Sequence, residues 1–124
     1  MNLEDTLKQM LEAAAAAAKI HWKDFRDFAE QEFRNLAEAG TQLEADYGAD
    51  VAEAQLQQDA AERDKLMQKA QERAELGFDN LRLAADGVFT ATTADGKIAA
   101  QYAINAALEV LRAAINKSAG IALL

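Results

Sequence analysis

The residue types that most often perform catalysis or bind metals are scarce in this chain, which has one histidine, His21, and no cysteine. Zinc sites need several Cys or His ligands, and a di-iron bundle needs Glu-x-x-His motifs, whereas Ala18 stands three residues before His21. No Gly-x-x-x-x-Gly-Lys phosphate loop is present, and Asp95-Gly96 lacks the preceding acidic ligands of an EF-hand. The sequence therefore predicts a non-enzymatic protein with no catalytic residue, metal or cofactor.

The single histidine adjoins aromatic residues at helical spacing, Trp22, Phe25, Phe28 and Phe33. At the edge of an apolar stripe, His21 is either a pH-sensitive switch or a boundary residue held by one hydrogen bond, and we favour the second interpretation. The aromatic residues form either a binding platform or part of a core. Their spacing of three and four favours the core.

Composition indicates a helical, acidic protein. The chain has no proline, is rich in alanine and carries a net charge of −8. Alanine is the best helix former and proline the worst. The negative charge argues against nucleic acid as a partner, because that affinity depends on lysine and arginine neutralising phosphates. The absence of cysteine, together with an acidic start that does not resemble a signal peptide, predicts a cytoplasmic location.

Hydrophobic periodicity predicts one domain, residues 1–124, made of three helices. Apolar residues repeat at three and four over residues 3–47, 50–85 and 97–119, and two Asp-Gly pairs mark residues 86–96 as a loop. We expect Phe89 in this loop to cover one end of the bundle. The predicted fold is an all-α, up-down-up helical bundle, in which a long antiparallel hairpin carries a shorter apolar third helix.

Two glycines, Gly40 and Gly48, compete for the turn of the predicted hairpin, since each is followed by a helix-capping signal. Glu32 and Arg63 each interrupt an apolar stripe, and a charge there costs stability unless it is paired. In an antiparallel hairpin, the residue numbers of two residues that lie opposite each other add up to the same value at every level. A structural ion pair between Glu32 and Arg63 therefore places the turn beside Gly48; the alternative is that both charged groups reach solvent.

Two leucines of the second predicted helix, Leu76 and Leu83, lie off its main apolar stripe. They are seven residues apart, which places them on one line along the helix. We expect the third helix or a neighbouring subunit to cover them.

The third predicted helix is apolar over more of its circumference than contact with one hairpin requires. One row of bulky residues has coiled-coil spacing: Ile104, Leu108, Leu111 and Ile115. A second row, here called the alanine seam, contains Ala99, Ala103, Ala106, Val110 and Ala114. We expect the bulky row to face the hairpin. The alanine seam, joined by Ile121, is then predicted to form the interface of a homo-oligomer.

These patterns predict a self-associating helical scaffold or adaptor that oligomerises through its C-terminal helix. The first alternative is a membrane-interacting protein that uses the same helix. Against it, the polar face lacks a lysine or arginine lining, and the longest uncharged stretch, residues 98–108, is shorter than the roughly 20 residues that span a bilayer. The second alternative is an acidic inhibitor or regulator of a basic partner, whose binding would weaken with salt.

Overall fold

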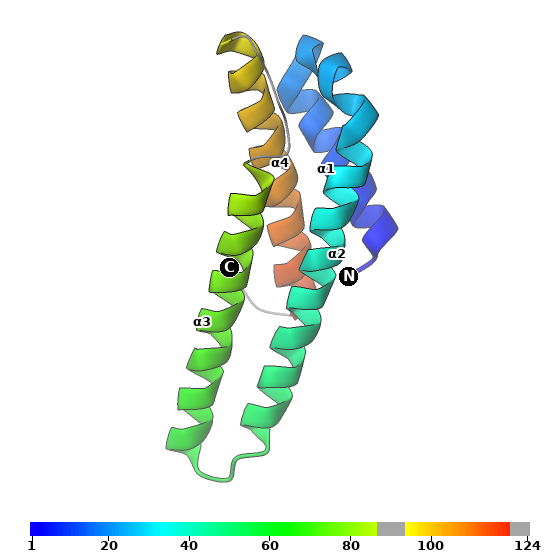
Figure 1. Ribbon diagram of the computed structural model, residues 1–124. Coiled ribbons are helices and arrows are strands. Elements are labelled where there is room, and N and C mark those ends of the chain that lie inside the picture. The colour runs from blue at the N-terminus through cyan, green and yellow to red at the C-terminus, as the bar shows by residue number, and fades with distance from the viewer. Residues whose placement is uncertain (87–93, 120–124) are drawn as a thin grey trace.

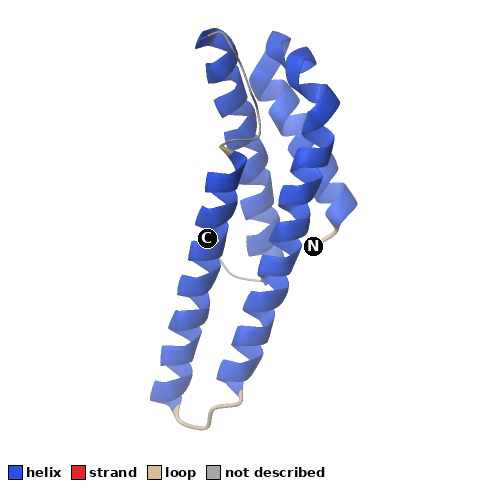
Figure 2. Cartoon of the chain, in the orientation of Figure 1, coloured by secondary structure: helices blue, strands red, loops and turns tan. Residues whose placement is uncertain are grey.

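Helices account for the regular structure of the described residues. The computed structural model describes residues 1–86 and 94–119. The elements are α1 Leu3–Ala18, the 3-10 turn η1 Lys19–His21, α2 Trp22–Gln55, α3 Ala60–Ala85 and α4 Ala94–Ala119. Figure 2 shows the same helices joined by short connections. The predicted all-α class is confirmed, but the predicted up-down-up order assumed three helices, and the described residues form four.

The first predicted helix, 3–47, is wrong because the chain reverses direction after α1. Lys19 adopts φ 55° and ψ −125°, and its amide donates to the carbonyl of Ala15. α2 then runs back along α1, so that Arg34 pairs with Glu4 near the start of α1. The hydrogen bond and the charge of Arg34 hold the pKa of the exposed Glu4 carboxyl below its ordinary value. α1 and α2 are therefore an antiparallel hairpin.

Replacing Lys19 by glycine is expected to stabilise the fold. A non-glycine residue in a sparsely populated region of φ and ψ costs about 1–3 kcal/mol. Glycine adopts this conformation freely but loses about 0.5–1 kcal/mol through the greater freedom of the unfolded chain. The net gain is expected to be about 1 kcal/mol, which thermal denaturation followed by circular dichroism should record as a rise of about 3–5 °C.

The matched control for this substitution is Lys8→Gly, at an exposed position in the middle of α1. It is expected to lower the stability by about 1 kcal/mol, because glycine there only weakens the helix. If Lys19→Gly melts at or below the temperature of the parent protein, the backbone at residue 19 is not strained.

The turn between α2 and α3 lies at residues 56–59, beyond both glycines that were predicted to form it. Gly40 and Gly48 are interior residues of α2. The carboxylate of Asp59 caps α3 by accepting a backbone hydrogen bond from its first turn. Both predicted turns are therefore wrong. Gly40 is buried at the contact with α4, where a Cβ would lie 2.8 Å from Cδ1 of Leu111.

The predicted ion pair between Glu32 and Arg63 is not formed, because the turn lies further along the chain and changes the register of the hairpin. The guanidinium of Arg63 donates instead to the carbonyl of Gln57 at 2.9 Å. Across the hairpin, Arg73 of α3 donates to Asp50 of α2 at 3.4 Å. The predicted register, in which Glu32 lies opposite Arg63, is therefore wrong.

α4 begins at Ala94, so the last three residues of the predicted loop 86–96 are helical, and Phe89 lies outside the described residues. The N-terminal turns of α1 border the C-terminal turns of α4, and Ala18 borders Ala99 at the other end, so the two helices run antiparallel. Figure 1 shows α1 and α4 beside the upper part of α2, while α3 and the rest of α2 continue below as a two-helix hairpin.

One hydrophobic core connects all four helices. Its largest fully buried side chains are Met10, Phe25, Phe33, Ile104, Leu111 and Ile115. α3 contributes Phe78 and small residues, Ala70, Ala74 and Ala85. α3 therefore has the thinnest apolar face of the four helices and presents most of its surface to solvent.

Candidate interaction surfaces

The residues that could carry chemistry lie mainly in packing positions. Within residues 1–86 and 94–119, no three acidic, histidine or cysteine side chains gather closely enough to hold a metal ion. His21 is half-buried, and its Nδ1 lies 3.8 Å from a carboxylate oxygen of Asp24. Phe25 and Phe33 are buried in the core, and the edge of Phe28 meets Phe25 with 6.5 Å between ring centroids. For Phe25 and Phe33 the core interpretation holds.

The alanine seam of α4 does not point outward over its first half. Ala99 is 6% exposed and Ala103 is fully buried within this one chain. The predicted outward orientation is wrong for these two residues, because α1 folds back after residue 18 and occupies the space assigned to a neighbouring subunit. Alanine side chains allow the two helices to approach closely, and here they pack α1 against α4 within one chain.

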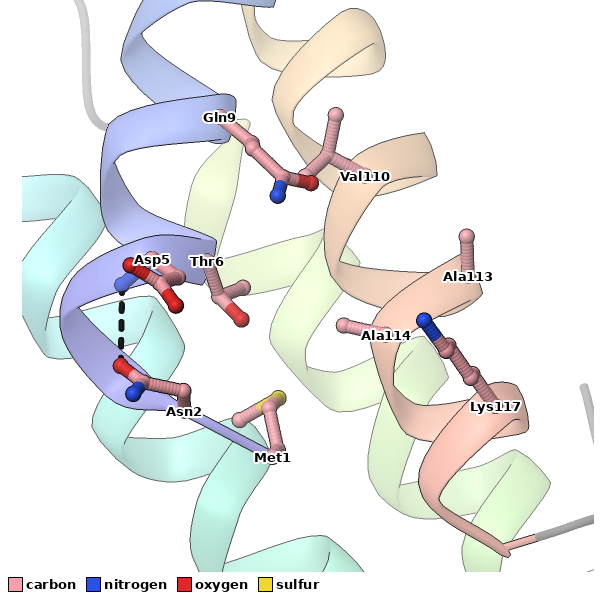
Figure 3. A pocket seen from close by; sticks show the side chains of 9 residues that line it. All are labelled: Met1, Asn2, Asp5, Thr6, Gln9, Val110, Ala113, Ala114 and Lys117. Atoms are coloured by element: carbon pink, nitrogen blue, oxygen red, sulfur yellow. Dashed lines mark hydrogen bonds between the residues drawn. The ribbon is translucent and has the colours of Figure 1, made fainter.

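The second half of the alanine seam borders an open groove between α4 and the start of α1. Figure 3 shows Val110 and Ala114 on one side and Thr6 and Gln9 on the other. The groove has a volume of about 540 Å³. Ala106, Val110 and Ala114 are half-buried, so the fold of the single chain leaves them partly accessible. Ile121, the last predicted interface residue, lies outside the described residues.

Two leucines on the outer surface of α3 are uncovered in this chain. Leu76 is 64% exposed and Leu83 is 70% exposed. At about 100° per residue they lie on one line, roughly opposite the buried Ala74 and Phe78. We call Leu76 and Leu83 the outer leucine face. The third predicted helix, now α4, does not cover it, so a neighbouring subunit is the remaining candidate from the sequence.

A further apolar surface, at the reversal between α1 and α2, was not predicted. Ile20, Ile98 and Tyr102 are 79%, 52% and 60% exposed, and all three line one hollow of about 290 Å³. No sequence pattern indicates this surface, since its two sides come together only when the chain reverses at Lys19. Lys19 and Asp95 line the same hollow and add a charge of each sign.

α4 is, among the described helices, the one that is long and apolar enough to cross a membrane by length and composition. A helix at the centre of a bundle can have the same length and apolar composition. The middle of α4 has that position here, since Ala103, Ile104, Ala107 and Leu111 are buried by the other helices. Packing within the chain thus accounts for the apolar composition of α4.

Comparison with protein-family models, with curated proteins and with solved structures finds no match to this chain. The arrangement of its own surfaces therefore provides the basis for a functional proposal.

Proposed function

We propose that this protein is a non-catalytic, self-associating helical scaffold whose copies meet through the outer leucine face of α3. The observation that carries the proposal is the exposure of Leu76 and Leu83, at 64% and 70%, on the side of α3 that faces away from α2. The proposal keeps the self-association predicted from the sequence and moves the interface from α4 to α3.

The geometry of α3 supports this surface over the alanine seam. Ala99 and Ala103 are already buried within the protomer, whereas the outer leucine face needs no rearrangement to become accessible. The two leucines are seven residues apart, which is the spacing of one of the two core positions of a heptad. A twofold axis beside α3 would bring the same face of two copies together and bury four leucines.

Charged residues flank the outer leucine face on both sides, and their signs favour a second copy of the chain as the partner. On the helical wheel of α3, Arg73 lies on one flank, Glu72 and Asp79 lie on the other, and Lys69, seven residues before Leu76, continues the line of the leucines. All four are exposed. Two parallel copies of α3 related by a twofold axis place the basic flank of one against the acidic flank of the other. This complementarity favours a second copy over an unrelated partner.

The double substitution Leu76→Gln and Leu83→Gln is expected to dissociate the assembly. Glutamine suits an exposed helix position, so the fold is retained. A partly buried leucine contributes about 0.7 kcal/mol. Four of them per dimer contribute about 3 kcal/mol, which corresponds to a rise of about 100-fold in the dissociation constant. Sedimentation velocity over a range of micromolar concentrations measures this change directly.

Leu56→Gln is the matched control, because Leu56 is 80% exposed but lies in the turn, outside the outer leucine face. It is expected to leave the molecular mass unchanged. A double variant that keeps the mass of the parent assembly would assign self-association to another surface, such as the groove beside Val110 and Ala114. If the parent protein is a monomer throughout and floats with liposomes, the membrane-interacting alternative replaces the scaffold proposal.

A further inference from the structure

Two arginines from different helices are positioned on one aromatic ring. The Cζ atom of Arg82, on α3, lies 5.7 Å from the centroid of the Phe78 ring. The Cζ atom of Arg112, on α4, lies 5.4 Å from the same centroid. Phe78 is 3% exposed, so the core fixes the ring. Attraction between a guanidinium and an aromatic ring then restricts both arginine side chains.

One of these guanidiniums has a buried donor without an acceptor among the described residues. The buried Nε of Arg112 has no acceptor within the described part of the chain. Its Nη1 contacts Glu109 at 3.3 Å, but the Glu109 side chain is 64% exposed, and such a pair at the surface is weak. Among the described residues, Arg82 forms no ion pair with Asp79 or Asp86, which lie one turn away on either side. A buried donor without an acceptor is a position where a water or an ion is expected.

Both arginines line one hollow of about 290 Å³, together with Asn105, Leu108 and Glu109. The side-chain amide of Gln101 donates to Oδ1 of Asn105 at 3.0 Å, which leaves Nδ2 of Asn105 as a donor. Two guanidiniums and one amide therefore border the same space, in a chain with a net charge of −8.

We propose that this hollow between α3 and α4 binds a phosphate group, either as the free ion or as part of a small phosphorylated molecule. Phosphate presents acceptor oxygens in several directions, so it can accept from two guanidiniums and an amide at once, and arginine suits it through paired hydrogen bonds. A carboxylate has acceptors in one plane, and Glu109 already supplies one at the rim. The proposal is independent of self-association, because the residues that line the hollow all belong to one chain.

The test is a titration of the full chain with inorganic phosphate at constant ionic strength, balanced with chloride. The Nε–Hε resonances of Arg82 and Arg112 in a nitrogen–proton correlation spectrum are expected to shift and saturate, with a dissociation constant on the order of 1 mM. Acetate is expected to bind about tenfold more weakly. Equal responses to phosphate and acetate, or a response without saturation, would overturn the assignment.

Substitutions of residues that line the hollow test whether phosphate binds there. Arg82→Gln and Asn105→Ala change exposed side chains, so the fold is retained, and each is expected to weaken phosphate binding about tenfold. Arg73→Gln is the matched control, since Arg73 is exposed on the same helix but does not line the hollow; its phosphate affinity should equal that of the parent. Equal weakening by Arg73→Gln, or no weakening by Arg82→Gln, would show that phosphate acts through the general charge of the surface.

Discussion

An Ala103→Glu substitution is expected to unfold the protein rather than to disrupt an oligomer interface on α4. Ala103 is fully buried on the enclosed side of α4. A carboxylate placed there has no partner, and burying an unpaired charge costs several kcal/mol. The larger side chain adds about 1–3 kcal/mol of overpacking. The sum approaches the whole stability of a domain, about 5–15 kcal/mol. Loss of the helical signal in far-ultraviolet circular dichroism at pH 7 measures the effect.

Ala113→Glu is the matched control, because Ala113 is exposed on the same helix. Its stability is expected to stay within about 0.5 kcal/mol of the parent. The contrast separates two descriptions of α4. The outward alanine seam predicted from the sequence requires Ala103→Glu to remain folded while the assembly dissociates, and that result would contradict the packing of α1 on α4.

The helical class was predictable because it depends on composition and periodicity over long segments, and neither needs a correct turn. The reversal at Lys19 was not predictable in the same way. Chain reversals are usually marked by glycine or proline, and here a lysine with φ 55° follows an uninterrupted alanine run. A single predicted helix over residues 3–47 does not contain this reversal, so it offers no segment of the chain that could cover the alanine seam of α4. The sequence therefore predicts an oligomer interface there.

The position of the second turn is marked in the sequence by a capping signal at Asp59. Asp59 is followed three residues later by Glu62, which is the spacing of a helix-capping box, and Asp59 does cap α3. Gly40 and Gly48 are followed by similar signals, but a glycine inside a helix also serves where another helix approaches closely. The charges of Glu32 and Arg63 do not resolve the choice, because one charged pair cannot determine the register of a hairpin.

The close contact between Gly40 and Leu111 leads to the second large expected effect. Leu111→Ala removes a fully buried side chain and is expected to lower the stability by about 2–5 kcal/mol. Gly40→Ala in the parent protein combines a helix-propensity gain of about 1 kcal/mol with an overpacking cost of about 1–3 kcal/mol, since the new Cβ would lie 2.8 Å from Cδ1 of Leu111. Urea denaturation of the single and double variants gives each free energy of unfolding.

In the Leu111→Ala background the steric conflict is absent, so Gly40→Ala is expected to stabilise the protein by about 1 kcal/mol. The coupling energy between the two positions is expected to be about 1–3 kcal/mol.

Gly48→Ala is the matched control. Gly48 lies in the same helix, is exposed, and a Cβ added to it would have no neighbouring atom within 4 Å. It is expected to stabilise the parent by about 1 kcal/mol. Equal effects of Gly40→Ala and Gly48→Ala in the parent, with no coupling to Leu111, would mean that α2 and α4 do not meet at Gly40, and the central position of α4 in the bundle would have to be abandoned.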